Sequence, residues 1–173
     1  MSKPCFYAPS FEGLAYFSDT WSAEAEAFLI REQCEKVEFD GRFEDFAFLK
    51  NCGQAIKHLR VINQSNKIDG LKYLQNLETL SIECKNKDPF SFEVFKKLRD
   101  LDIKWTNKPQ VLSALRHSNI KELALANLPE LDEMVSNESL EKIRLERLKT
   151  KDLSAFTRFA RLSAIPGPGP DMS

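Results

Sequence analysis

The residues best spaced for acid–base chemistry in this chain of 173 residues are Asp100 and Asp102. On a β-strand, residues two apart point to the same side, so the two side chains could form a carboxylate pair. A pair of this kind becomes catalytic where an enclosed, water-poor pocket shifts its pKa values. The two histidines, His58 and His117, are far apart in the sequence, and neither accompanies a recognisable Ser or Cys nucleophile motif.

The four cysteines give little support for metal or disulfide chemistry. Cys5, Cys34, Cys52 and Cys84 are scattered and form no C-x-x-C pair, whereas a zinc site needs paired ligand spacings. With only six glycines, the chain also has no glycine-rich phosphate-binding loop. We therefore expect no enzymatic activity, no metal and no cofactor, and we expect the cysteines to pack as small buried hydrophobic residues.

Composition and charge limit the class of partner and the compartment. The formal net charge of −1 provides no general attraction to nucleic acid or to an anionic membrane, so we expect neither as a partner. Residues 1–13 lack the apolar run and cleavage site of a signal peptide. No segment approaches the roughly 20 apolar residues that span a bilayer. These features predict a cytoplasmic, single-domain protein.

A repeat of apolar side chains must position all of these residues. Leu71, Leu74, Leu77, Leu80 and Ile82 are spaced by three, three, three and two residues, and the same spacing recurs 21 residues later. A spacing of three is typical of a helical or 3₁₀ segment and a spacing of two of a strand, so each unit contains both. Such a unit buries its apolar residues only against neighbouring copies, which predicts a stacked repeat protein.

Written as L-x-x-L-x-L, the pattern occurs six times and is followed by a degenerate seventh copy, with successive copies 19–22 residues apart. The copies are Cys34/Val37/Phe39, Ile56/Leu59/Val61, Leu77/Leu80/Ile82, Leu98/Leu101/Ile103, Ile120/Leu123/Leu125, Leu140/Ile143/Leu145 and Phe159/Leu162/Ala164. In this pattern and spacing, residues 34–165 resemble a leucine-rich repeat protein. The resemblance implies an α/β solenoid with a curved parallel β-sheet on its concave side and helical or 3₁₀ turns on its convex side.

The pattern predicts strands at 36–40, 58–62, 79–83, 100–104, 122–126 and 142–146, and a weak strand at 161–165. A helix is predicted over 22–33, because Trp21, Ala25, Phe28 and Leu29 share one face. Residues 1–33 would form an N-terminal cap over the end of the core. Within this cap, Phe11, Leu14 and Tyr16 could be a further degenerate copy of the pattern. The Pro- and Gly-rich tail, 166–173, is expected to be disordered.

The chain departs from the family pattern at one position. Leucine-rich repeats usually carry Asn or Cys three residues after the last strand leucine, where it bonds backbone groups of the turn. The residues at this position are Arg42, Gln64, Lys85, Thr106, Leu128 and Leu148. Asn86 and Asn107 lie one residue later and could substitute. We therefore expect the turn geometry to vary between copies.

In each strand, read as x-L-x-L-x, the two apolar residues point into the core and the other three form the concave face. Over the middle three strands this face carries four acidic residues against Lys104 alone, namely Glu83, Asp100, Asp102 and Glu122. Basic residues flank this acidic centre, with Arg60 on one side and Lys142, Arg144 and Arg161 on the other. An open groove lacks the enclosed pocket that the Asp100–Asp102 pair would need for catalysis.

Two interpretations of this face remain open. Its charges could receive a basic protein partner, or they could serve only to keep an exposed strand surface soluble. Trp105, directly after the strand at 100–104, could be an exposed interface anchor or lie buried in a turn. We favour a partner-binding surface, whose residues would be Arg60, Glu83, Asp100, Asp102, Lys104, Trp105, Glu122 and Arg144.

A chain that is nearly all solenoid can act only by occupying the surface of a partner, which favours an inhibitor. In this respect it resembles the small bacterial leucine-rich repeat immunity proteins, which neutralise the toxin domains of contact-dependent growth inhibition systems. The resemblance implies a monomer that forms a heterodimer with a basic toxin domain, often a nuclease, and occludes its active site with the concave face. The alternative is a non-catalytic adaptor that holds two partners through separate surfaces.

Overall fold

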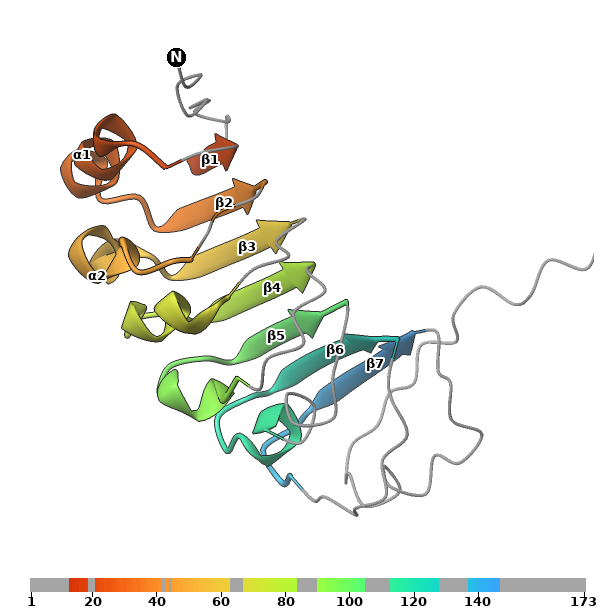
Figure 1. Cartoon of the computed structure of the whole chain (residues 1–173). Helices are drawn as coiled ribbons and strands as arrows, with labels where there is room; N and C mark the ends of the chain where they lie inside the picture. Colours follow the sequence, from red (N-terminus) through yellow and green to blue (C-terminus); the bar gives the residue numbers. More distant parts are fainter. Residues whose placement is uncertain are drawn as a thin grey trace, which may run out of the picture.

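The computed structural model describes residues 13–18, 21–41, 43, 45–62, 67–83, 90–104, 113–127 and 137–146. Within them, seven strands form one open, parallel sheet whose spatial order is also the order along the chain. Figure 1 shows these strands side by side in a curved sheet. Because neighbouring strands are parallel and consecutive, the chain must cross back to the starting edge of the sheet after every strand.

The six strands predicted between residues 36 and 146 are confirmed, with β5 ending one residue early. The strands are β1 Leu14–Ser18, β2 Lys36–Asp40, β3 His58–Ile62, β4 Thr79–Glu83, β5 Asp100–Ile103, β6 Glu122–Ala126 and β7 Lys142–Glu146. Their register places equivalent residues in straight rows, so that Leu59, Leu80 and Leu101 are direct neighbours. The strand predicted at 161–165 and the tail at 166–173 lie outside the described residues.

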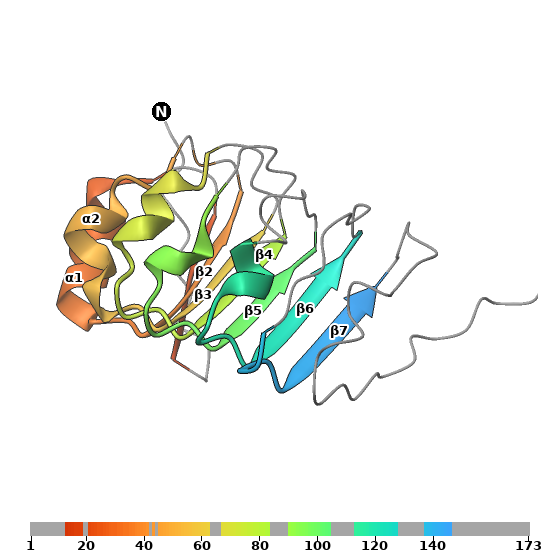
Figure 2. The ribbon, with the colours of Figure 1, turned by 90° about the horizontal axis from the view of Figure 1, so that it is seen from below.

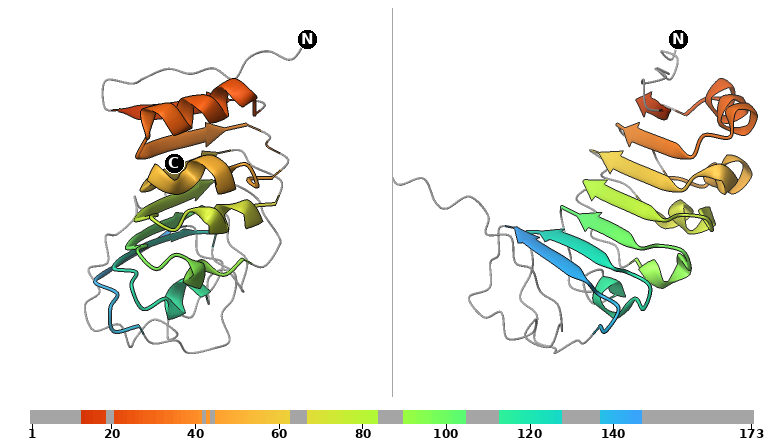
Figure 3. Two further views of the ribbon diagram at one scale, coloured as in Figure 1. Left: turned by 90° about the vertical axis from the view of Figure 1, so that its left-hand side faces the viewer. Right: turned by 180° about the vertical axis from the view of Figure 1, so that it is seen from behind.

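The helical segments lie along one side of this sheet (Figure 3). They are α1 Ala23–Glu32, α2 Leu49–Cys52 and the 3₁₀ helices η1 Gly53–Ala55, η2 Asp69–Tyr73 and η3 Phe92–Val94. The predicted first helix is confirmed. It is capped at its start by Ser22, whose hydroxyl oxygen accepts the Ala25 N–H at 3.2 Å, and at its end by Gln33, which has a left-handed conformation.

The first strand is out of register with the prediction by one residue. Its buried side chains are Ala15 and Phe17 rather than Leu14 and Tyr16, which lie in the outward rows. Phe17 stacks on Phe39 of the neighbouring strand, with ring centroids 5.5 Å apart. Because a shift of one residue would exchange the faces of every side chain in β1, burial of the Phe17 ring decides the register.

Aromatic rings fill the core at the N-terminal end of the sheet. Trp21 stacks on Phe48 at 3.8 Å, and Phe39 contacts both of these rings as well as Phe46. Cys52 is buried in the same core, and this burial raises the pKa of its thiol to about 12. Its packing is that of a small hydrophobic residue. Cys5 and Cys84 lie outside the described residues.

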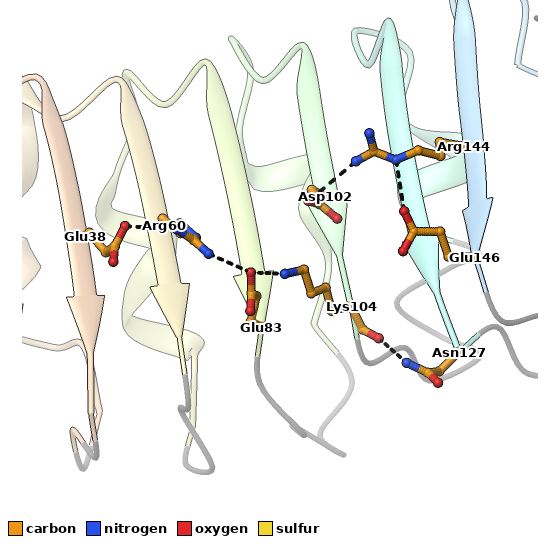
Figure 4. Close-up of polar contacts among 8 residues, drawn as sticks. All are labelled: Glu38, Arg60, Glu83, Asp102, Lys104, Asn127, Arg144 and Glu146. Atoms are coloured by element: carbon orange, nitrogen blue, oxygen red, sulfur yellow. Dashed lines mark hydrogen bonds and ion pairs between the residues drawn. The ribbon is translucent and has the colours of Figure 1, made fainter. Parts of the chain in front are cut away.

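Side-chain amides connect consecutive turns along the edge where the strands begin. Each donates a hydrogen bond to a backbone carbonyl of the preceding unit, from Asn76 to Gln54 at 2.8 Å, from Asn119 to Lys96 at 2.7 Å and from Asn137 to His117 at 2.9 Å. The six positions at which the family usually has Asn or Cys, and also Asn86 and Asn107, lie outside the described residues. These three amide contacts lie before the strands, at positions that the pattern does not mark, and a fourth, from Asn127 to the Lys104 carbonyl oxygen at 2.7 Å, follows β6 (Figure 4).

His117 is a buried polar residue at a core position that an apolar side chain fills in the two preceding units, with 4 % of its surface exposed. Its Nδ1 accepts the N–H of Asn119 at 3.2 Å, and its Nε2–H donates to the carbonyl oxygen of Phe95 at 3.0 Å. Burial lowers the pKa of this imidazole, because the charged form would lose its hydration. The neutral ring therefore joins two units of the stack.

This burial predicts a loss of folding stability in mild acid. Below about pH 6.5 the unfolded chain protonates His117 before the folded chain does, so the free energy of unfolding should fall as the pH drops further. Above that pH the contribution is fully present. Urea denaturation at a series of pH values should therefore show a shallower decline for His117→Gln. Equal slopes for wild type and His117→Gln would contradict this account.

Candidate functional site

The outward residues of the strands form three straight rows, which we call the open face. The helical segments pack against the opposite side of the sheet (Figure 3). The first row is Leu14, Lys36, His58, Thr79, Asp100, Glu122 and Lys142. The middle row is Tyr16, Glu38, Arg60, Ser81, Asp102, Ala124 and Arg144. Lys104 follows β5 directly and lies beside Glu83 in the third row.

An ion-pair ladder crosses the open face from β2 to the end of β5 (Figure 4). Arg60 contacts Glu38 through Nη1 at 3.4 Å and Glu83 through Nη2 at 2.9 Å. The Glu83 carboxylate also pairs with the ammonium group of Lys104. Burial by itself raises the pKa of Glu83, but the hydrogen bonds from Lys104 and Arg60 outweigh it and leave this pKa lowered. Glu83 is therefore held ionised by cations on both sides.

The cations of β7 reach back across the sheet toward the acids of β5 and β6. Arg144 lies with Nη2 3.9 Å from an Asp102 oxygen and with Nε 3.4 Å from Glu146 (Figure 4). Lys142 Nζ is 3.1 Å from a Glu122 oxygen. These side chains are about half exposed, so each pair contributes little to stability. They do, however, set the charge that a partner would meet.

The acidic centre predicted from the sequence is therefore largely paired with neighbouring cations. Asp100 is the exception, because it forms no ion pair with any described residue. Its carboxylate accepts a hydrogen bond from the Thr79 hydroxyl, whose oxygen lies 3.0 Å from His58 Nδ1. His58, Thr79 and Asp100 are therefore neighbours in the first row of the open face.

A hollow of about 240 Å³ opens at the middle of this face, and we call it the central hollow. It exists because Ser81 and Ala124, on either side of Asp102, are much smaller than Arg60 and Arg144 in the same row. The residues of the open face that line it are Thr79, Ser81, Asp100, Asp102, Glu122, Ala124, Lys142 and Arg144. Partial burial raises the pKa values of both Asp100 and Asp102. The two carboxylates are thus incompletely solvated and face a space that a side chain could enter.

The predicted site residues fall into two groups. Asp100, Asp102, Glu122 and Arg144 line the central hollow. Arg60, Glu83 and Lys104 form the ladder beside it. Trp105 lies outside the described residues, so its two alternatives stay predictions. Sequence reasoning missed four lining residues, although small residues in the middle row were a signal that could have located the hollow; the four are Thr79, Ser81, Ala124 and Lys142.

Among the described residues, no group of three or more His, Cys, Asp or Glu side chains is arranged to hold a metal ion. Within the same residues, no helix is long and apolar enough to cross a membrane. Comparisons of the chain with protein families, curated proteins and solved structures gave no match.

Proposed function

We propose that this chain is a leucine-rich repeat protein that binds a protein partner through its open face. The repeat length of 19–22 residues and a parallel sheet ordered as in the sequence support this assignment. In this proposal the unit made by β1 and α1 serves as the N-terminal cap. Its helix carries the exposed acids Glu24 and Glu32 on the side away from the core.

The central hollow is the observation that carries the proposal. Asp100 forms no ion pair with the described residues, and the nearest cation of Asp102, Arg144, lies at 3.9 Å. Both carboxylates have lost part of their hydration, so a Lys or Arg side chain inserted between them would restore favourable interactions. Ser81 and Ala124 leave room for the aliphatic part of such a side chain. The proposed partner therefore presents a basic residue to this hollow.

The inhibitor interpretation follows from the same contact. A basic toxin domain, such as a nuclease, would dock its active-site cations against Asp100, Asp102 and Glu122, and the open face would block its substrate. The ladder residues would flank this contact and fix its register, because Arg60 and Lys104 repel misplaced cations. The alternative function, an adaptor, requires a second partner on a different surface.

Reversing the charges of Asp100 and Asp102 should distinguish a contact at the central hollow from a general effect of net charge. The double variant Asp100→Lys/Asp102→Lys is expected to bind the partner at least about tenfold more weakly, because it places two cations in the hollow. The control Glu24→Lys/Asp69→Lys makes the same change in net charge at exposed positions on the helical side. Its affinity should stay within about twofold of wild type.

The measurement is affinity purification from cells that produce the chain, followed by calorimetric titration of the purified partner at two salt concentrations. The wild-type affinity should fall with salt, and the hollow variant should lose most of this dependence. Equal affinities for wild type and the hollow variant would remove Asp100 and Asp102 from the binding site. A partner whose enzymatic activity survives in the complex would favour the adaptor over the inhibitor.

A further inference from the structure

We propose a second binding surface, a basic hollow at the edge of the sheet where β5, β6 and β7 begin, which receives an acidic segment of a protein. The hollow has a volume of about 470 Å³. Its lining comprises Glu78, Lys96, Lys97, Arg99, Ser118, Asn119, Lys121 and Ser139. Figure 2 shows the turns that lead into these strands side by side along this edge. None of the lining residues belongs to the open face, so this surface is independent of the function proposed above.

The cations of the basic hollow are mostly free to meet a ligand. Lys96 and Arg99 are exposed and form no ion pair with any described residue. Lys97 donates to the neutral amide oxygen of Asn76 at 2.8 Å, so its charge is not compensated by that contact. Lys121 pairs with Glu141 at 2.8 Å, and both side chains are about half exposed. A pair this exposed is weak enough for an incoming carboxylate to replace Glu141.

The backbone that carries these cations is held in a fixed arrangement. The carbonyl oxygen of Glu78 accepts two hydrogen bonds, from the N–H of Arg99 at 2.9 Å and from that of Asp100 at 3.2 Å. The carbonyl oxygen of Arg99 likewise accepts from Lys121 at 2.7 Å and from Glu122 at 3.1 Å. The Asn119 amide fixes the turn at Lys96. Because the framework is already ordered, less conformational entropy is lost when an anion binds.

The mixture of charges favours an acidic protein segment over nucleic acid. Four cations line the hollow, but Glu78 lies among them and Glu141 lies beside Lys121. A phosphate backbone carries a charge on every nucleotide and would meet these carboxylates, whereas a peptide can place its acids selectively. The guanidinium of Arg99 offers two parallel donors, which match a carboxylate. The hydroxyls of Ser118 and Ser139 add neutral donors at short range.

Two surfaces with opposite charge preferences would allow the chain to bind two partners. The open face and the basic hollow meet at the start of β5, where Arg99 lines one and Asp100 lines the other. A chain that binds a basic partner on the face and an acidic segment at the edge can hold both at once. This arrangement is the one that the adaptor alternative requires.

The test uses the full chain and a fluorescein-labelled peptide of about eight residues in which glutamate alternates with serine, which spans about 26 Å when extended and covers the three turns. Binding is followed by fluorescence anisotropy. The variant Lys96→Glu/Arg99→Glu is expected to weaken binding at least about tenfold, and the neutral Lys96→Gln/Arg99→Gln less so. The matched control Lys50→Glu/Lys67→Glu makes the same net charge change at exposed lysines elsewhere and should stay within about twofold of wild type. Thermal melting checks that each variant is folded.

Three results would overturn the proposal: no saturable binding of the peptide to the wild-type chain, equal weakening in the control, or tighter binding of an oligothymidylate of equal length. The variant Asp100→Lys/Asp102→Lys should still bind the peptide. Peptide binding by this variant would show that the two surfaces act separately. The open-face proposal could then fail while the basic hollow still binds the peptide. Conversely, a chain that fails to bind the peptide could still bind a basic partner on the open face.

Discussion

Gly70→Ala should destabilise the fold by at least about 3 kcal/mol, because the added methyl group has no space. A Cβ atom at Gly70 would lie 2.1 Å from the backbone carbonyl carbon of Phe46 and 2.5 Å from the Ala47 nitrogen. Both are backbone atoms of the preceding unit and cannot rotate away. The substitution would therefore force η2 away from its neighbour and open the core around Leu71, which is fully buried. Urea denaturation gives the free energy of unfolding that checks this value.

Gly53→Ala is the matched control for this prediction. A Cβ atom at Gly53 would lie 2.4 Å from Leu74 Cδ2, which is the end of a flexible side chain. The Leu74 rotamer can change, so the expected loss is about 1–3 kcal/mol. If Gly53→Ala were as damaging as Gly70→Ala, contact with the backbone would not be the cause of the loss.

The strands between residues 36 and 146 were predictable because their apolar spacing is regular. Each unit changes from a spacing of three to a spacing of two at the same point, so the strand and its inward residues are fixed together. The register of β1 was not predictable, because Phe17, whose burial sets this register, is one of several apolar residues in a short stretch. The choice depends on the ring contact with Phe39, which is remote in sequence.

The candidate site was predictable as a set of positions but not as a pattern of charge. Strand alternation places Glu83, Asp102 and Arg144 on one face. It does not say that Arg144 reaches two strands back toward Asp102, or that Glu83 lies between two cations. Long basic side chains have many rotamers, and their final contacts depend on neighbours in three strands. For the same reason the net acidity inferred from the sequence overstates the charge available to a partner.

The central hollow was missed for a different reason. A hollow is a difference in side-chain size between adjacent rows, and alternation alone does not reveal it. Ser81 and Ala124 have little significance in their own strands, but the register places them on either side of Asp102. Ser81 and Ala124 can therefore be identified as the sides of a hollow only once the parallel register of the sheet is known.

Leu101→Ala, in the interior of the sheet, is expected to cost roughly 2–5 kcal/mol of folding stability. Leu101 is 2 % exposed and lies between Leu80 and Leu123 in one continuous apolar row. The cavity would therefore remove contacts from the two units that it separates. Since each strand pairs only with its neighbours, a weak link at this point should also reduce the cooperativity of unfolding. Guanidinium denaturation followed by circular dichroism reports both the free energy and the steepness of the transition.

Leu145→Ala makes the same change in β7, where the side chain is only partly buried. Its expected cost is about 1 kcal/mol, because less apolar surface returns to water and one fewer described strand adjoins it. The difference between the two variants measures how far stability depends on continuity through β5. Equal losses for the two variants would mean that damage at the end of the stack spreads as far as damage in its middle, and nearest-neighbour stacking would then be the wrong description of this fold.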